Sequence, residues 1–362
     1  MATFIAKKAF QLDDIDLNWF VRFFDDYNFV DGYNDEMPNG TIVEDLFLIA
    51  GKQGKRQEAV ALGGTGFVEG SPGALTAGTV EEIAVFNSAL KQLYSVAGVS
   101  LDAADLYAAS QTLSNLDDIA LFATMLAGDD TIALSNFDDQ IDGGDGNDDI
   151  TGKDGNDTVH GGAGNDTLDG GLGKDMVLYT GTQAVTVDLS VTTQQATGFW
   201  GDDFIIGFEG VTTGSGNDSV TGSAKGNTLI SGDGSDTVSG GGGRDKLTGG
   251  GQADVLSGGV DGDRDTFIYL DLADSTASER DLINDFVSGT DLISLSALDA
   301  NDTASGNQVF GWGGKTATAN AVWYADTGAN LVVFADTNGD AVADFEIEVA
   351  GIDKLTRADF LL

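Results

Sequence analysis

Aspartate and glycine recur with a period of nine residues through the middle of this chain. Four copies follow one another without a gap from Gly143 to Leu178, each close to the pattern Gly-Gly-x-Gly-x-Asp-x-U-x, in which U is aliphatic. A fixed period of this kind is the signature of a repeat architecture, in which each unit buries its apolar face only against its neighbours. The chain is therefore expected to coil into stacked turns rather than to fold around a single compact core.

The acidic place of the repeat can be followed through two blocks. Asp130 and Asp139 keep the register upstream but lack the double glycine, and after an interruption at about 178–211 the pattern resumes at Asp218. Asn227 is neutral, and Asp265 arrives two residues late. The candidate metal ligands of the two blocks are Asp130, Asp139, Asp148, Asp157, Asp166, Asp175, Asp218, Asn227, Asp236, Asp245, Asp254 and Asp265.

The residue types of the repeat suit calcium. Glycine reaches backbone conformations with positive φ, so that carbonyl groups can turn toward one point. Aspartate adds a hard anionic oxygen, and Ca²⁺ takes six to eight oxygen ligands. The aliphatic residue two places after the aspartate points toward a core. The alternative reading, a flexible linker rich in glycine and aspartate, does not explain about a dozen copies in one register.

The net negative charge of the chain also indicates that it binds cations. The 362 residues include 59 Asp and Glu against 17 Lys and Arg, which gives a formal charge of −42. Such a chain lacks the basic face that nucleic acid or an anionic membrane requires. With no Cys and a single His, it offers neither thiolate sites nor metal sites built from several imidazoles. A compact fold would repel itself unless cations were bound.

These nonapeptides closely resemble those of the RTX (repeats-in-toxin) family of secreted calcium-binding proteins. The resemblance implies a right-handed parallel β-roll in which two nonapeptides make one turn and acidic residues 18 apart bracket one Ca²⁺, with roughly eight ions in the chain. The implied pairs are Asp130 with Asp148, Asp139 with Asp157, Asp148 with Asp166, Asp157 with Asp175, Asp218 with Asp236, Asn227 with Asp245, and Asp236 with Asp254.

The fold class expected is mainly β, with the roll in two blocks between a mixed α/β N-terminal domain and a β-rich C-terminal domain. The expected domains are 1–126, the first block 127–178, a β spacer 179–211, the second block 212–268, and 269–362. In the first domain, helices are expected at 15–24, 100–107 and 115–122 and strands at 58–67 and 79–86.

The last domain alternates apolar and polar residues in short strands, with hairpin turns at Thr327–Asn330 and Asn338–Asp340. It resembles the C-terminal domain of serralysin-type secreted proteases. That resemblance implies an uncleaved type I secretion signal, which Asp359-Phe-Leu-Leu matches.

Asp336 to Asp344 is spaced like the start of an EF-hand loop. Ala341 and Ile347, however, stand where the loop needs Gly and Glu, so an acidic turn is favoured over a further Ca²⁺ site.

Known catalytic motifs are missing from the sequence. The serralysin zinc motif needs three His, whereas His160 is the only one here, and no Gly-x-Ser-x-Gly pentapeptide occurs. His160 occupies the ninth place of a repeat, which favours an ordinary strand residue. Carboxylate-only chemistry is compatible with the residue types. An extracellular carbohydrate-active or other hydrolytic enzyme, with its site in residues 1–126, therefore remains the alternative.

The sequence predicts a non-catalytic structural protein, secreted by a Gram-negative bacterium, that Ca²⁺ folds at or near the cell surface as a surface-layer, adhesin or biofilm-matrix component. No run of about 18 apolar residues would span a membrane, and residues 1–10 lack the order of a cleaved secretory signal. The expected partners are Ca²⁺, the type I secretion machinery and either further copies of the chain or a cell-surface glycan, without nucleic acid. A soluble glycan-binding module is a third reading.

Overall fold

The computed structural model describes residues 3–6, 24–30, 35–36, 42–43, 45–53, 56–69, 75–87, 92–102, 123–301 and 304–362. By its internal packing the chain divides into two compact units, Met1–Asp175 and Met176–Leu362. Their regular structure is almost entirely β-strand, which confirms the mainly β fold class. Within the described ranges, no helix is both long enough and apolar enough to cross a membrane.

The first repeat block forms two parallel ladders of three-residue strands. One ladder contains β9 (Thr131–Ala133), β11 (Asp149–Thr151) and β13 (Thr167–Asp169), and the other contains β10 (Gln140–Asp142) and β12 (Thr158–His160). Successive strands along the chain alternate between the ladders. Residues 18 apart are therefore neighbours, as the β-roll requires, and Ile150 lies between Ile132 and Leu168.

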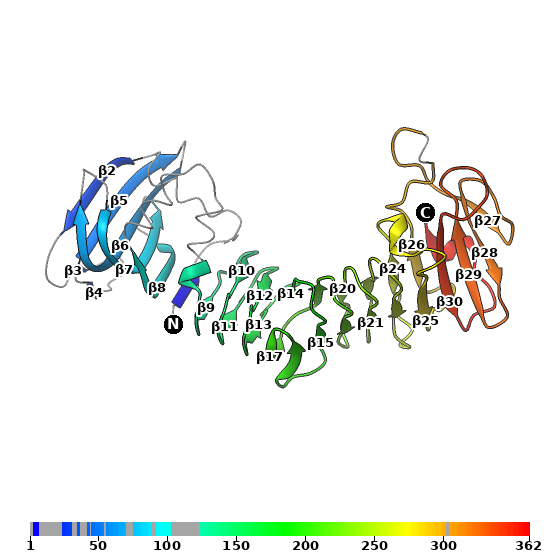
Figure 1. Ribbon diagram of the computed structural model, residues 1–362, viewed down its shortest axis with the longest axis horizontal. Coiled ribbons are helices and arrows are strands. Elements are labelled where there is room, and N and C mark those ends of the chain that lie inside the picture. Colours follow the sequence, from blue (N-terminus) through cyan, green and yellow to red (C-terminus); the bar gives the residue numbers. More distant parts are fainter. Residues whose placement is uncertain are drawn as a thin grey trace. The chain divides into compact units, whose positions relative to one another are not determined.

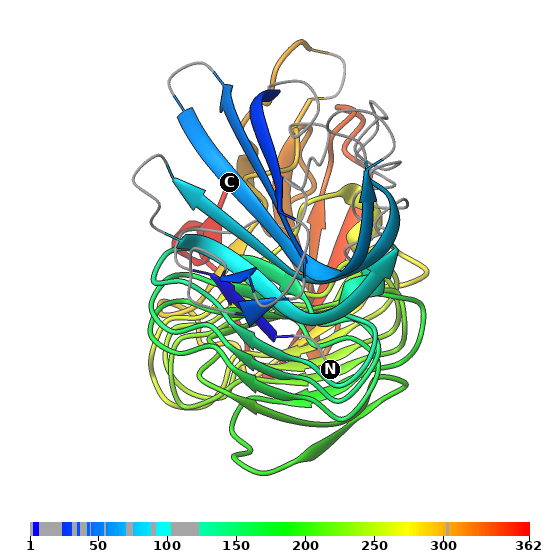
Figure 2. The ribbon, with the colours of Figure 1, turned by 90° about the vertical axis from the view of Figure 1, so that its left-hand side faces the viewer.

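The second unit repeats this arrangement over more turns (Figure 1). One ladder runs through β14 (Met176–Tyr179), β18 (Gly210–Thr213), β20 (Thr228–Ile230), β22 (Lys246–Thr248), β24 (Thr266–Ile268) and β26 (Leu292–Ser294). The other runs through β15 (Thr186–Asp188), β19 (Ser219–Thr221), β21 (Thr237–Ser239), β23 (Val255–Ser257) and β25 (Asp281–Asn284). Seen end-on, the turns of this unit overlie one another as flattened loops (Figure 2).

The core of the roll consists of the aliphatic residue of each repeat. Leu229 lies beside Leu247, and Val238 lies beside Leu256, each in parallel register and fully buried. The flanking residues of each three-residue strand are less buried, since alternate side chains of a strand point to opposite faces. Each fully buried aliphatic side chain contributes about 1.5–3 kcal/mol. Every turn therefore adds a similar increment to one continuous core.

Glycine is required where one turn lies against the next. Gly250 has φ +97°, and a Cβ at that position would overlap the carbonyl oxygen of Gly232, one turn earlier. Gly262 has a similar φ of +86°, but no described heavy atom lies within 4 Å of the place its Cβ would take. The second glycine of the repeat thus serves both the left-handed backbone and the close approach of the stacked loops.

The interval between the two repeat blocks contains further β-strands. β15 pairs with β19, so that Val187 lies beside Val220 and continues the stack. Between β15 and β18, β16 (Gln195–Gly198) and β17 (Gly201–Ile206) form an antiparallel hairpin. Asp203, in β17, is fully buried and accepts hydrogen bonds from the hydroxyls of Tyr179 and Thr197, both at 2.8 Å.

The C-terminal part extends both ladders. β30 (Phe345–Ala350) continues the ladder of β25, and the sheet then extends in order through β29 (Asn330–Ala335), β28 (Ala321–Asp326) and β27 (Gly311–Gly314). β31 (Phe360–Leu361) pairs with β26. The predicted hairpin turn is confirmed at Thr327, whose N–H donates to the Asn330 carbonyl at 3.0 Å. The second predicted turn, at Asn338, lies between the antiparallel strands β29 and β30.

The described N-terminal strands form an antiparallel sheet that includes β2 (Phe24–Val30), β5 (Asp45–Gln53), β6 (Arg56–Glu69), β7 (Leu75–Asn87) and β8 (Gln92–Asp102). β1 (Thr3–Ala6) pairs with β8 and also, in parallel, with β9. The predicted strands at 58–67 and 79–86 are confirmed within β6 and β7.

The helices expected in the N-terminal domain are not confirmed. Ser100, expected to cap a helix, lies instead in β8, where Leu101 and Asp102 pair with Val80 and Thr79 of β7. Sheet pairing thus outweighs the local helix signal at these residues. Phe24, expected at the end of a helix, lies in β2. The helix predicted at 115–122 and the rest of the other two lie outside the described residues.

Substitution of Gly250 and Gly262 by Ala should separate backbone strain from lack of space. Gly262→Ala is expected to cost about 1–2 kcal/mol, the penalty of a left-handed conformation for a residue with a Cβ. Gly250→Ala should cost several kcal/mol, because the same strain is joined by overlap with the neighbouring turn. Urea unfolding in saturating Ca²⁺ measures the free energy of unfolding of both variants. Equal decreases in this free energy would show that the loops around Gly250 can shift to accommodate a Cβ.

Candidate metal centre

The acidic places of the repeat are buried and lie next to one another along each ladder. All twelve candidate ligands, from Asp130 to Asp265, are at most 3% exposed. Each stands directly before a short strand. Because successive turns place equivalent residues side by side, the aspartates form two columns in each unit, one beside each ladder of strands.

A regular hydrogen bond joins each residue of a column to the next. The backbone N–H of one acidic residue donates to Oδ1 of the residue one turn downstream, as from Asp148 to Asp166 at 2.8 Å and from Asp236 to Asp254 at 2.9 Å. All seven pairs implied by the sequence are linked in this way. Each carboxylate is therefore held in place by one of its two oxygens.

The columns continue past the last nonapeptide through two residues that the sequence interpretation missed. Asp254 N–H donates to Asp281 Oδ1 at 2.9 Å, and Asp265 N–H donates to Asp291 Oδ1 at 3.1 Å. Asp281 and Asp291 stand two places before Ile283 and Ile293, which is the aspartate-to-aliphatic spacing of the repeat. That spacing could have identified them, but insertions lengthen their distance from the previous turn to 27 and 26 residues.

The second carboxylate oxygen of several column residues is buried and lacks a hydrogen-bond partner among the described residues. This group consists of Asp148, Asp157, Asp245 and Asp254. A Cβ on the first glycine of the same repeat would stand 2.5 Å from Asp148 Oδ2 and 2.6 Å from Asp157 Oδ2, at Gly143 and Gly152. Glycine thus leaves space around an oxygen for which the described residues supply no donor, which fits a hard cation such as Ca²⁺.

Burial makes these carboxylates hard to ionise in the absence of a cation. It raises the pKa of Asp148 and Asp281 to about 8, that of Asp157, Asp254 and Asp265 to about 7, and that of Asp236 and Asp245 to about 6. Neighbouring carboxylates of the same column raise several of these pKa values further, whereas the N–H bond from the adjacent turn lowers them. A cation held nearby would reverse this cost.

Two of the candidate ligands are arranged differently. Asp139 Oδ2 accepts hydrogen bonds from both the N–H and the hydroxyl of Ser135, at 2.7 and 2.6 Å. Asn227 Oδ1 likewise accepts from the N–H and hydroxyl of Ser223, at 2.7 and 3.2 Å. In these two repeats serine replaces the second glycine. The oxygen that is left over elsewhere is occupied by protein donors here, so these residues do not fit a cation.

Within the described ranges, no group of three or more His, Asp and Glu side chains is gathered at one point. The acidic residues instead form columns, with one carboxylate per turn. A Ca²⁺ ion beside a column would therefore take most of its six to eight oxygens from backbone carbonyls. His160 lies in β12 with Nδ1 3.1 Å from Asp142 Oδ2, and this pair stands apart from the acidic columns.

The acidic turn at Asp336 is held by its own backbone. Asp336 is fully buried, and its two carboxylate oxygens accept hydrogen bonds from the N–H groups of Asn320, Asn338, Gly339 and Ala341. These donors hold the pKa of Asp336 below its usual value, although burial alone would raise it. With both oxygens engaged, the geometry favours the predicted acidic turn.

The last acidic residue also has a structural role. Asp359 is fully buried, and its carboxylate accepts hydrogen bonds from the Ser288 hydroxyl at 2.9 Å, the Gly289 N–H at 2.7 Å and the Thr356 N–H at 2.6 Å. The next residue, Phe360, pairs with Ile293 in the ladder. The motif that resembles a secretion signal is therefore part of the folded sheet.

Comparison with known proteins points to one family. The model of the family described as peptidase M10 serralysin C terminal matches residues 102–362. A serralysin from Photorhabdus sp. (strain Az29) is 36% identical over 100 residues, which are 27% of this chain and 20% of the serralysin. The chain thus corresponds to one fifth of the length of that relative.

Two solved structures share limited similarity. One is the solution structure of the AlgE6R3 subunit from the Azotobacter vinelandii mannuronan C5-epimerase, at 25% identity and a TM-score of 0.31, covering 40% of this chain and 77% of that one. The other is the crystal structure of extracellular lipase LipA from Serratia marcescens, at 19% identity and a TM-score of 0.24, covering 65% and 40%.

The raised pKa values predict how the metal-free protein responds to pH. Between about pH 4, where the unfolded carboxylates titrate, and pH 6–8, where the buried ones do, the folded form binds more protons than the unfolded form. Its stability should therefore fall as pH rises through this window. Far-UV circular dichroism in metal-free buffer should show β-structure increasing from pH 8 to pH 5, and a loss of structure on acidification would contradict the assignment.

Proposed function

Because the chain belongs to the peptidase M10 serralysin C-terminal family, whose model spans residues 102–362, we propose that it is a secreted protein that folds on Ca²⁺ and acts as a structural component of the cell surface. Calcium binding and type I secretion are typical of RTX β-roll proteins. The observation that carries the proposal is the set of buried carboxylate oxygens for which the described part of the chain supplies no hydrogen-bond donor.

The proposed Ca²⁺ ligands are the candidate acidic residues of the two blocks without Asp139 and Asn227. They are Asp130, Asp148, Asp157, Asp166, Asp175, Asp218, Asp236, Asp245, Asp254 and Asp265, with Asp281 added. The ion would neutralise the columns, while glycine keeps the space beside each carboxylate open. Roughly eight Ca²⁺ ions would carry about +16, against a formal protein charge of −42, so the folded protein would remain acidic and well solvated.

The proposed role of Ca²⁺ is to switch folding on outside the cell. An ion that binds only the folded form stabilises it by RT ln(1 + [L]/Kd), which is about 1.4 kcal/mol per site at ten times Kd. Roughly eight such sites would contribute ~11 kcal/mol, comparable with the stability of a whole domain. In the cytosol, where free Ca²⁺ is scarce, the same repeats would stay unfolded and could pass through an export channel.

The structural role is the finer part of the proposal. It is supported by the absence from the sequence of zinc-protease and serine-hydrolase motifs. His160, the only histidine of the sequence, lies in a repeat strand with Nδ1 3.1 Å from Asp142 Oδ2. The surface-layer, adhesin and matrix roles share one requirement, a protein that becomes rigid only after it has left the cell.

Replacing a column carboxylate should weaken Ca²⁺-dependent folding. Asp254→Asn keeps the size of the side chain but removes its charge, so the Ca²⁺ concentration at the folding midpoint is expected to rise several-fold. Asp353→Asn, which changes an exposed aspartate outside the columns, is the matched control and should leave the midpoint unchanged. Circular dichroism during Ca²⁺ titration measures both. An unchanged spectrum of the parent protein in EGTA would rule out Ca²⁺-driven folding.

The structural role predicts assembly and retention. Purified protein with added Ca²⁺ should form sheets or filaments in electron microscopy, and cell-bound protein should be released by EGTA. Dispersed monomers in Ca²⁺ would favour a soluble glycan-binding module. Turnover on a panel of polysaccharides, abolished by one carboxylate substitution within residues 1–126, would overturn the structural role in favour of a hydrolytic enzyme.

A further inference from the structure

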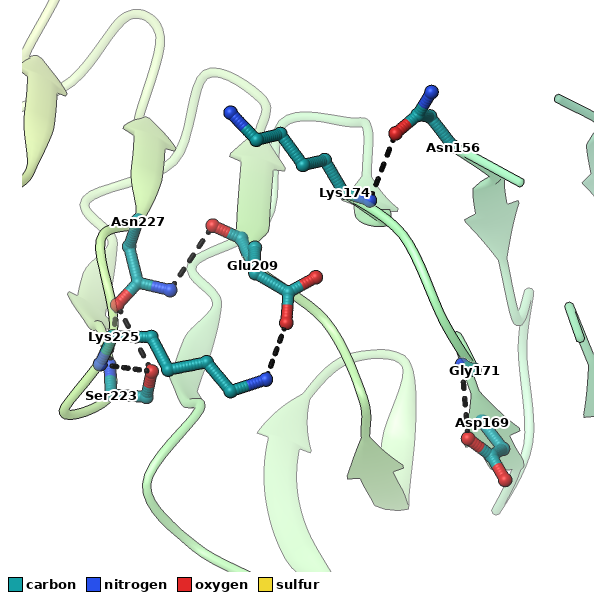
Figure 3. Close-up of polar contacts among 8 residues, drawn as sticks. All are labelled: Asn156, Asp169, Gly171, Lys174, Glu209, Ser223, Lys225 and Asn227. Atoms are coloured by element: carbon teal, nitrogen blue, oxygen red, sulfur yellow. Dashed lines mark hydrogen bonds and ion pairs between the residues drawn. The ribbon is translucent and has the colours of Figure 1, made fainter. Parts of the chain in front are cut away.

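One turn of the second block has its polar groups satisfied without a metal. Asn227 takes the acidic place of its repeat, and its backbone N–H donates to Asp245 Oδ1 at 2.7 Å, as in every other turn of the column. Its side chain differs, because Ser223 supplies two hydrogen bonds to Oδ1 and the amide nitrogen donates to the Glu209 carbonyl at 3.1 Å (Figure 3). Both ends of the amide are therefore engaged within the protein.

A lysine lies at the same turn. Lys225 replaces the last glycine of the Gly-Gly-x-Gly pattern, and its ammonium lies 2.7 Å from Glu209 Oε1 (Figure 3). Glu209 precedes Asn227 by 18 residues and so takes the place one turn earlier in the column. The position where two acidic residues would bracket an ion thus contains one carboxylate, one neutral amide and an internal cation.

The next turn of the same column gives the comparison. Its repeat, Gly240 to Thr248, has glycine at the places of Ser223 and Lys225. Asp245 is fully buried, and its Oδ2 has no hydrogen-bond partner within the described ranges. The two turns share one backbone register, with Leu229 beside Leu247. They therefore differ in side-chain chemistry rather than in fold.

A second turn, in the first unit, repeats the combination of serine and lysine. Ser135 donates its N–H and hydroxyl to Asp139 Oδ2, and the ammonium of Lys153, from the following turn, donates to the Leu134 carbonyl. Here the acidic place keeps its carboxylate, yet the oxygen that would face an ion is again occupied. Loss of the second glycine and provision of an ammonium therefore occur together at two separate places in the chain.

We propose that the turn from Gly222 to Asn227 closes without Ca²⁺, with the Lys225 ammonium standing in for the metal. This inference deepens the proposed function and rests on it. The side chain of Lys225 is 69% exposed, so its ion pair with Glu209 adds little to stability. Its effect is to exclude the metal: a divalent ion would have to displace an ammonium while losing one of the two carboxylates that compensate for its dehydration.

The metal-free turn stands next to the spacer, whose buried acid is also satisfied by protein donors. Asp203 accepts hydrogen bonds from the hydroxyls of Tyr179 and Thr197. The column that contains Asn227 therefore enters the second block through a nonapeptide that closes without Ca²⁺, on which the metal-dependent repeat of Asp245 can stack. Calcium binding would then extend an existing end instead of nucleating a turn from a disordered chain, which is the costly step in ordering a repeat array.

Restoring the repeat tests the inference by counting bound ions. The variant S223G/K225G/N227D rebuilds Gly-Gly-Ala-Gly-Gly-Asp at residues 222–227, and equilibrium dialysis at saturating Ca²⁺ should find one more ion per chain than in the parent protein. The single variant Asn227→Asp, which keeps Lys225 and Ser223, should bind no additional ion, because Ser223 still donates to one oxygen of residue 227 and the Lys225 ammonium keeps its place beside Glu209.

Two controls separate the possible outcomes. Asp245→Asn, on the same column, should lower the number of bound ions, and circular dichroism in Ca²⁺ verifies that each variant folds. An extra ion in Asn227→Asp alone, or none in a folded triple variant, would overturn the role of Lys225. If the triple variant does not fold, the number of ions bound by Asn227→Asp still tests the proposal: an unchanged number supports it, and an additional ion overturns it. If the parent protein binds no Ca²⁺, the result would instead refute the proposed function.

Discussion

The hydrogen bond from each acidic residue of the columns to the carboxylate one turn further on is the interaction on which the rest of the roll depends. It fixes the 18-residue register, since a shift by one nonapeptide would place an acidic residue over the wrong ladder. In each such bond, one oxygen of the carboxylate accepts the backbone N–H of the adjacent turn. This hydrogen bond also fixes the direction in which the second oxygen points. The same contact thus determines both how the turns stack and where the negative charge is concentrated.

Burying that charge opposes folding unless something compensates for it. A buried, unpaired carboxylate costs several kcal/mol and responds by taking up a proton. At several places the protein itself compensates: Ser135 donates to Asp139, backbone N–H groups saturate Asp336, and the hydroxyls of Tyr179 and Thr197 donate to Asp203. At the remaining acidic residues of the columns, the proposed Ca²⁺ would compensate. The dependence on calcium is therefore distributed unevenly along the chain.

Much of this arrangement could be predicted from the sequence, because a nine-residue period constrains the backbone more tightly than local propensity does. The period predicted a stacked repeat and the burial of residues such as Leu247, and the resemblance to RTX proteins implied the parallel ladders and the neighbours of each aspartate. It did not predict the ladder contacts of Asp281 and Asp291, since insertions interrupt the spacing. Nor could it show that Glu209 accepts hydrogen bonds from the Lys225 ammonium and the Asn227 amide, because Glu209 lies 18 residues before Asn227 in a segment without the repeat.

The columns also make the roll a linear polyelectrolyte. Parallel strands are about 4.8 Å apart, whereas two unit charges in water interact with an energy near RT at about 7 Å. Carboxylates ionised at every turn would therefore lie closer together than the distance at which their repulsion equals the thermal energy. Counterions would gather along each column in response. Sodium and magnesium would compete with calcium along its length, so that ionic strength would affect the assembly of the roll as a whole and not one site at a time.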